Sequence, residues 1–211
     1  MASLTSVFDD AHMRNYPKGQ ILLYQGEKTN DVFRITSGYV KVYDVTAQGA
    51  EKLMILLGPG DIFPLIWTFR GNDSLNYFYE TIDETEVAVV PREGLITSLK
   101  TSHQFTVHLL EYFVERSSDL MKRIECIEGT SAKHKVAQVL DYLAHSHGDE
   151  IAEEAYKVRI PITHQMIADM AGITRETASL QLKKLEKGKM IKNTDDHLLI
   201  HLDRVNDKVL S

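Results

Sequence analysis

The stretch from Pro161 to Ile191, PITHQMIADMAGITRETASLQLKKLEKGKMI, determines the fold of the C-terminal part of this chain. Two segments with helical spacing flank Gly172, and the small residues Ala168 and Ala178 stand where two crossing helices would touch. Glycine suits the turn because it adopts positive φ without steric cost, and Thr174 is a good N-cap for the second helix. The apolar positions of the buried side are Ile167, Met170, Ala171, Ile173, Leu182 and Leu185. This pattern predicts a helix-turn-helix.

The start of the second helix carries the chemistry for contacting DNA bases. Arg175 can donate two hydrogen bonds to guanine O6 and N7, and Glu176 can accept one from cytosine N4. The predicted base contacts are Arg175, Glu176, Ser179 and Leu180. The predicted phosphate ligands, which would fix register, are Thr163, His164, Gln165, Thr174, Thr177 and Lys183. Two alternatives stay open: a plain helical hairpin with its charges in water, and a Leu180 that packs or faces solvent instead of touching a thymine methyl group.

The charge of the chain supports DNA binding locally and not globally. The whole chain has 24 basic and 30 acidic residues, whereas residues 131–211 have 12 of each. Residues 173–192 hold six basic and two acidic side chains, a local charge of +4. A neutral domain with one basic face fits a site-specific duplex binder and does not fit a general nucleic-acid coat protein.

Composition restricts the class of protein. A length of 211 residues predicts one or two domains. The single cysteine, Cys126, excludes an internal disulfide framework and an iron–sulfur cluster held by one chain, and we expect it to be a small packed residue. No segment approaches about 18 consecutive apolar residues, and the N-terminus lacks the features of a signal peptide, so we predict a cytoplasmic protein without a membrane partner.

Residues 17–92 alternate short apolar runs with turns, which predicts a jelly-roll-like β-roll. The expected strands are Ile21–Tyr24, Val32–Ile35, Tyr39–Val45, Leu53–Leu57, Tyr77–Ile82 and Glu86–Val90. The roll contains no histidine and no cysteine, so a metal-dependent enzyme of the cupin type lacks its ligands there. We therefore expect no enzymatic activity and no metal site.

A long helix follows the roll, and its apolar residues repeat every three and four positions. The predicted seam is Leu110, Phe113, Ser117, Leu120, Ile124 and Ile127, the heptad spacing of a two-stranded coiled coil. This pattern favours a homodimer, although the helix could instead pack on its own roll. Residues 129–131, Gly-Thr-Ser, are expected to end the helix.

The predicted fold class is α+β with three parts. Residues 1–105 form the β-roll sensor domain, residues 106–129 the dimerisation helix, and residues 130–211 a winged helix-turn-helix. In the third part, residues 132–144 form an amphipathic helix, and a β-hairpin with a polar turn at residues 193–196 forms the wing.

Four residues after this helix could in principle bind a metal ion, namely His145, His147, Asp149 and Glu150. A solvated loop at the end of the helix is the favoured interpretation of this segment.

These elements and local sequences resemble the Crp/Fnr (cyclic-AMP receptor protein and fumarate-nitrate regulator) family of bacterial transcription regulators. The resemblance covers nearly the whole chain and is most specific in residues 131–144, SAKHKVAQVLDYLA, and residues 173–191, ITRETASLQLKKLEKGKMI. It is weaker in residues 16–43 and in residues 58–63, GPGDIF. The resemblance implies a homodimer on a palindromic promoter site, a contact with RNA polymerase, and an input to the roll that reorients the DNA-binding domains.

The resemblance also assigns roles and exposes differences. Arg175 and Glu176 match the base-contacting Arg-Glu pair of the family, but Leu180 stands where the family often has another arginine. Cyclic-nucleotide binders of the family carry a Gly-Glu pair after the Gly-Asp motif and an arginine further on, whereas this chain has Pro64-Leu65 and Leu75-Asn76. A buried cyclic phosphate without a cationic clamp would cost several kcal/mol. Control by cyclic AMP is therefore not expected.

The sequence does not identify the molecule that would bind the roll and control the protein. Apolar side chains gather in the segment that would line a ligand site, namely Phe63, Leu65, Trp67, Tyr77 and Tyr79. They form either a site for a small-molecule effector that the sequence does not identify or simply the core of the roll. Two alternatives are a cyclic-nucleotide-responsive regulator with a non-standard phosphate clamp, for example Arg70, and a haem-binding protein.

Overall fold

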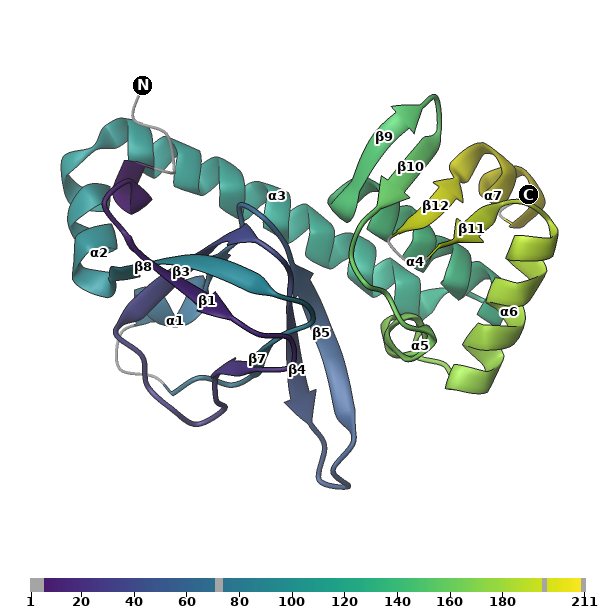
Figure 1. Cartoon of the computed structure of the whole chain (residues 1–211), viewed down its shortest axis with the longest axis horizontal. Helices are drawn as coiled ribbons and strands as arrows, with labels where there is room; N and C mark the ends of the chain where they lie inside the picture. The colour runs from purple at the N-terminus through teal and green to yellow at the C-terminus, as the bar shows by residue number, and fades with distance from the viewer. Residues whose placement is uncertain (1–5, 71–73, 195–196, 210–211) are drawn as a thin grey trace. The chain divides into compact units, whose positions relative to one another are not determined.

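The computed structural model describes residues 6–70, 74–194 and 197–209. The chain divides into two compact units, Met1–Val114 and Glu115–Ser211. Helix α3 (His103–Glu128) begins in the first unit and ends in the second (Figure 1). The structure has the predicted long helix, which ends directly before residues 129–131 but begins three residues earlier than the predicted start at residue 106.

The first unit is built on two four-stranded antiparallel sheets, as expected for a β-roll. One has the strand order β1-β8-β3-β6 and the other β2-β7-β4-β5. The strands are β1 (His12–Tyr16), β2 (Ile21–Leu23), β3 (Asp31–Ser37), β4 (Val40–Val45), β5 (Glu51–Leu57), β6 (Ile62–Phe63), β7 (Phe78–Thr81) and β8 (Thr85–Pro91). The helices of this unit are η1 (Ser6–Phe8), α1 (Leu65–Arg70) and α2 (Arg92–Thr101), together with the start of α3.

Strand β3 has buried side chains on both faces, and these alternate between two cores. Phe33 and Ile35 belong to a core that both sheets share. Val32 faces the other way, into a second core formed with residues of α2 and α3 such as Leu95 and Phe105. These two cores explain why most strands of the roll could be predicted from apolar runs.

Among the described elements of the first unit, η1, β1, β6, α1 and α2 were not predicted. Strand β1 pairs with β8 at the edge of its sheet, and its sequence, HMRNY, is mostly exposed and has no apolar alternation. Helix α1 covers Leu65–Arg70, a segment that was expected only to line a ligand site. Short elements without a periodic pattern leave little signal in a sequence.

The second unit contains the end of α3 and the predicted winged helix-turn-helix. Its elements are α4 (Ala132–His147), β9 (Gly148–Ala152), β10 (Ala155–Val158), α5 (His164–Ala171), α6 (Arg175–Lys187), β11 (Ile191–Asn193), β12 (Leu198–His201) and α7 (Leu202–Val209). Ser131 caps α4 by accepting a hydrogen bond from the backbone N–H of His134 at 3.2 Å. The sheet has the order β11-β12-β10-β9, and β11 with β12 forms the predicted hairpin. Part of its expected turn, residues 195–196, lies outside the described residues.

The expectation of a solvated loop around His145 and His147 is wrong. Helix α4 continues to His147, and β9 follows directly. The His147 ring lies against Tyr142, with 5.7 Å between the ring centroids. Burial, with a further contribution from Arg116 that Asp119 opposes, lowers the pKa of His147 from 6.5 to about 4.

The lowered pKa of the partly buried His147 makes the second unit sensitive to acid. Its pKa is lower in the folded chain than in the unfolded chain, so the unfolded chain binds the proton more tightly. The stabilisation is present above pH 6.5 and is lost as pH falls toward 4, by about 3 kcal/mol in total. We expect urea unfolding of His147→Gln to depend less on pH in this range than that of the unsubstituted protein. The half-exposed His145 is the control, since His145→Gln should leave the dependence in place. An equal pH slope in both variants would contradict the assignment.

Candidate nucleic-acid interface

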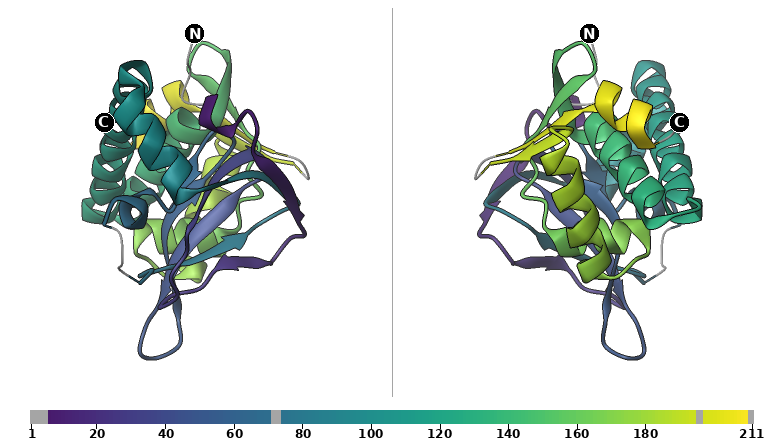
Figure 2. Two further views of the ribbon diagram at one scale, coloured as in Figure 1. Left: turned by 90° about the vertical axis from the view of Figure 1, so that its left-hand side faces the viewer. Right: turned by 90° about the vertical axis from the view of Figure 1, so that its right-hand side faces the viewer.

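The helix-turn-helix has the predicted geometry. Gly172 ends α5 in the left-handed region, with φ 61° and ψ 41°, a conformation that glycine adopts without strain. Ala168 and Ala178 are both fully buried, which allows α5 and α6 to approach closely. The two helices lie side by side in each view (Figure 1 and Figure 2). The predicted motif is therefore confirmed.

Threonine hydroxyls cap both helices of the motif. Thr163 accepts a hydrogen bond from the backbone N–H of Met166 at 3.1 Å, and Thr174 accepts one from that of Thr177 at 3.3 Å. The Thr174 and Thr177 hydroxyl oxygens are also 3.0 Å apart. An α-helix leaves its first four N–H groups without an intrahelical partner, so donors remain at both helix starts after capping. All the predicted phosphate ligands except Lys183, which lies further along α6, are thus at or next to helix starts whose backbone N–H groups suit an anion.

The predicted base contacts lie on one side of α6. Arg175 and Glu176 are exposed at its first turn, and the Leu180 side chain, 54% exposed, follows one turn later. Lys183, a predicted phosphate ligand, is also exposed. Ser179 is partly buried because it faces the start of α5. The structure thus brings together the side chains that sequence reasoning selected on this helix.

The two polar residues at the start of α5 differ in their contacts. His164 lies with its ring Nδ1 atom 2.9 Å from the Ser179 hydroxyl oxygen. Gln165 instead donates to the carboxylate of Asp169 at 2.7 Å, one turn along the same helix. His164 therefore contacts a predicted base contact, Ser179, whereas Gln165 contacts its own helix.

A buried arginine ties α3 to the helix-turn-helix. Arg123 is 6% exposed, and its Nη1 atom donates to the backbone carbonyl of Met170 at 2.8 Å. Met170 lies in the last turn of α5, where carbonyl groups lack intrahelical donors, so Arg123 acts as a C-terminal cap. Its guanidinium carbon also lies 5.7 Å from the centroid of the Tyr142 ring. Sequence reasoning missed Arg123. Arg123 stands three residues after Leu120 and four before Ile127, and a charged residue that flanks a predicted seam is ordinarily exposed, so the sequence did not mark it.

A second polar tie joins α3 to α4. Ser146 donates to the carboxylate of Asp119 at 2.9 Å, and Arg116 lies 3.1 Å from the other carboxylate oxygen. Cys126 is buried nearby on α3, and burial raises the pKa of its thiol, as expected for a small packed residue. The end of α3 therefore belongs structurally to the unit that contains the helix-turn-helix.

The opposite side of α3 is apolar and exposed. We name this surface the α3 strip; its apolar members are Val107, Leu110, Val114, Leu120, Met121, Ile124 and Ile127. Among the predicted seam residues, Ser117 is exposed with them, whereas Phe113 is half-buried and its ring centroid lies 5.8 Å from that of Phe69. Val114 and Met121 are 61% and 69% exposed, so the strip is centred slightly away from the predicted seam.

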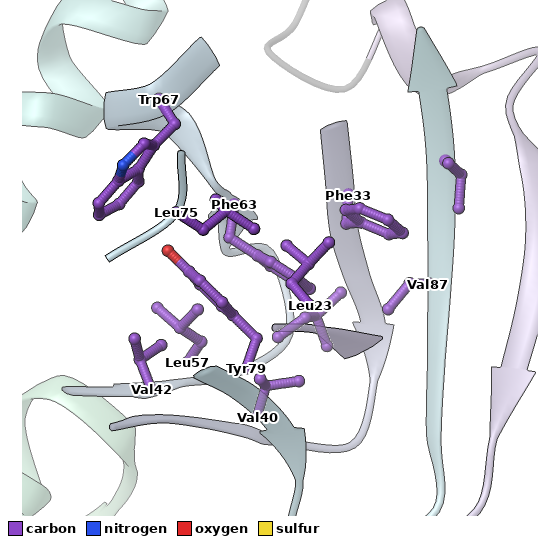
Figure 3. Close-up of a cluster of buried hydrophobic side chains, with 12 residues drawn as sticks. Leu23, Phe33, Val40, Val42, Leu57, Phe63, Trp67, Leu75, Tyr79 and Val87 are labelled. Atoms are coloured by element: carbon purple, nitrogen blue, oxygen red, sulfur yellow. The ribbon is translucent and has the colours of Figure 1, made fainter. Parts of the chain in front are cut away.

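Aromatic side chains fill the space between the sheets of the roll. Phe63 stacks with both Phe33 and Tyr79, each at 5.2 Å between ring centroids. Leu75, where cyclic-nucleotide binders would place an arginine, is 2% exposed in the same core (Figure 3). Trp67 and Tyr77 also contact this core, with their rings 5.8 Å apart.

Leu65 does not join the other residues that were selected for an effector site. It lies in the second core of the roll, with Leu95 and Phe105. Of the five residues selected, the structure thus brings together Phe63, Trp67, Tyr77 and Tyr79.

The described parts of the chain contain neither of two other kinds of site. Among these residues, no group of three or more histidine, cysteine, aspartate or glutamate side chains lies close enough together to hold a metal ion. None of the described helices has the length and apolar character to cross a membrane.

Comparison with known proteins gives matches along most of the chain. The family model described as "Cyclic nucleotide-binding domain" matches residues 13–102, and the "Crp-like helix-turn-helix domain" matches residues 134–205. The HTH-type transcriptional regulator ArcR of Staphylococcus haemolyticus is 28% identical over 192 residues, covering 90% of this chain and 83% of that protein. The cAMP-activated global transcriptional regulator CRP of Pasteurella multocida is 24% identical, covering 89% of this chain and 85% of that protein.

A solved structure has the same fold over most of its length. FixK2 from Bradyrhizobium japonicum superposes with a TM-score of 0.77 at 20% identity, covering 93% of this chain and 96% of that chain. At this identity the similarity concerns the fold alone.

Proposed function

We propose that this protein, which belongs to the Crp/Fnr family of DNA-binding transcription regulators, acts as a homodimer that places α6 of each copy in the major groove of an inverted-repeat promoter site. Its relatives ArcR and CRP are named as transcription regulators. The observation that carries the proposal is the exposed side of α6, where Arg175 and Glu176 stand at the first turn beside a capped helix start. Arginine and glutamate there match a guanine–cytosine element.

The proposal is tested by selecting bound duplexes from random DNA with the purified full chain at moderate salt. We expect inverted repeats with a guanine–cytosine element in each half-site. Leu180 presents no hydrogen-bond donor, so the base pair beneath it should show a weaker preference than the one beneath Arg175. Equal binding to scrambled duplexes would contradict the proposal.

The dimer is supported by the α3 strip. Seven apolar residues along one side of a helix would remain in water in a single copy, and two copies of the strip, related by two-fold symmetry, would cover each other. A two-fold dimer also matches the symmetry of an inverted repeat. A contact with RNA polymerase is proposed from the family alone.

We do not expect cyclic AMP to bind the roll. The position of the phosphate-binding arginine is taken by Leu75, whose side chain is buried in the aromatic core. A nucleotide there would have to displace that core and bury its phosphate charge without a cation. The alternative clamp through Arg70 would require the same displacement.

We therefore expect cyclic AMP to leave the melting temperature unchanged up to millimolar concentration. Ligand at about 100 times its Kd stabilises a protein by about 2.7 kcal/mol, which corresponds to a rise of several degrees. The CRP of Pasteurella multocida, named as cAMP-activated, serves as the positive control. A saturable rise with this chain would favour the alternative of a cyclic-nucleotide-responsive regulator with a non-standard clamp.

A further inference from the structure

We propose that His164 is a positioning residue that fixes the direction of the Ser179 hydroxyl hydrogen, so that Ser179 offers only acceptor lone pairs to the DNA bases. The inference rests on the proposed function and deepens it, because it assigns the type of base that one position of the half-site requires. The observation behind it is the 2.9 Å separation between His164 Nδ1 and Ser179 Oγ.

The two residues are held together by the packing of the motif. His164 is the first residue of α5, and its backbone is placed by the Thr163 cap. Ser179 follows the fully buried Ala178, where α6 touches α5. Both side chains are partly buried, so the contact is shielded while one side of each remains accessible. The pair therefore belongs to the fixed part of the motif.

The chemistry of DNA phosphate selects the tautomer of the imidazole ring. A neutral imidazole has one nitrogen that donates and one that accepts. Phosphate oxygens only accept hydrogen bonds, so a ring that turns Nε2 toward a phosphate at the start of α5 carries its hydrogen on Nε2. The Nδ1 atom then has a lone pair, and the hydrogen bond with Ser179 must run from the hydroxyl group to His164.

This direction leaves Ser179 able to accept hydrogen bonds from DNA bases but not to donate them. A serine whose hydroxyl rotates freely can either donate to a base or accept from one. Once its hydrogen points at His164, Ser179 can only accept. In the major groove the donors are the amino groups adenine N6 and cytosine N4, whereas guanine O6 and N7 and thymine O4 are acceptors. We therefore infer that Ser179 favours adenine or cytosine on the strand that it contacts.

The test compares four variants with the unsubstituted full-length protein at one fixed pH and salt concentration. His164→Leu removes the acceptor, Ser179→Ala removes the hydroxyl group, and the double variant removes both. His164→Asn is the conservative control, because an asparagine carbonyl oxygen can replace Nδ1 as the acceptor. Each protein is titrated with a duplex carrying the selected site, in which one base pair at a time is exchanged.

We expect one base pair per half-site at which the unsubstituted protein prefers adenine or cytosine by about three- to tenfold, the range for one neutral hydrogen bond. His164→Leu and Ser179→Ala should both abolish this preference, and the double variant should lose no more than either. His164→Asn should restore most of it. Such non-additive losses identify two residues that act as a unit.

Two results would overturn the inference while leaving the proposed function standing. One is a His164→Leu protein that binds all duplexes more weakly by the same factor with an unchanged base profile, as expected for a phosphate contact alone. The other is loss of the preference in His164→Asn as well as in His164→Leu, with melting temperatures equal to that of the unsubstituted protein. If the unsubstituted protein itself prefers no inverted repeat, the proposed function fails first.

Discussion

Arg175→Ala is expected to weaken binding to the selected site by about 1–3 kcal/mol, or roughly 5- to 150-fold in Kd. The exposed Arg175 side chain caps nothing and fills no core, so the melting temperature should not change. The loss should be concentrated at one base pair, because a guanidinium group matches guanine O6 and N7 with two hydrogen bonds. Duplexes that lack this guanine should bind the variant and the unsubstituted protein about equally.

Lys187→Ala is the matched control for Arg175→Ala. Lys187 is another exposed basic residue of α6, but it lies at the other end of the helix. A contact there could reach only phosphate, so its loss should weaken all duplexes alike and reduce the salt dependence. If Arg175→Ala behaved in the same way, with its base profile unchanged, Arg175 would be a phosphate ligand and not a base contact.

Met121→Glu is expected to convert the proposed dimer into monomers. Met121 is the most exposed member of the α3 strip, at 69%, so the substitution should not disturb the fold of one copy. In a two-stranded arrangement it would bury two like charges without partners, which costs more than about 3 kcal/mol, or over 100-fold in the dimer dissociation constant. Leu120→Glu should act in the same direction, less strongly, because Leu120 is 48% exposed.

Analytical ultracentrifugation measures this effect directly, and affinity for the inverted repeat should fall in parallel. Glu111→Lys is the control, since it changes a charge at an exposed polar position of α3 outside the strip. An intact dimer for Met121→Glu at micromolar concentration would show that the strip is not the dimer interface.

The sequence was most informative where a periodic apolar pattern is bounded by residues that start or end a helix. The Gly172 turn and the Thr174 cap have strict backbone requirements, so the helix-turn-helix could be located from the sequence. The long α3 helix could be predicted for the same reason, through its apolar repeat and the break at residues 129–131.

Features that depend on contacts distant in the sequence could not be predicted. Arg123 contacts a carbonyl group 47 residues away, and nothing in its neighbourhood marks it as buried. Phe113 fits the heptad pattern as well as Val114 does, and only the second core of the roll decides that Phe113 turns inward. Strand β1 has no pattern of its own and forms by pairing with β8.

The buried cap that Arg123 places on α5 has a consequence for promoter architecture. Because α3 and the helix-turn-helix share this hydrogen bond inside one compact unit, each recognition helix is attached firmly to the stem beside it. Two such stems joined along their length would hold the recognition helices at a single distance and rotation. One added base pair between half-sites turns one of them by about a tenth of a helical turn relative to the other. Operators for this protein should consequently share one invariant spacer length, even where their base sequences diverge.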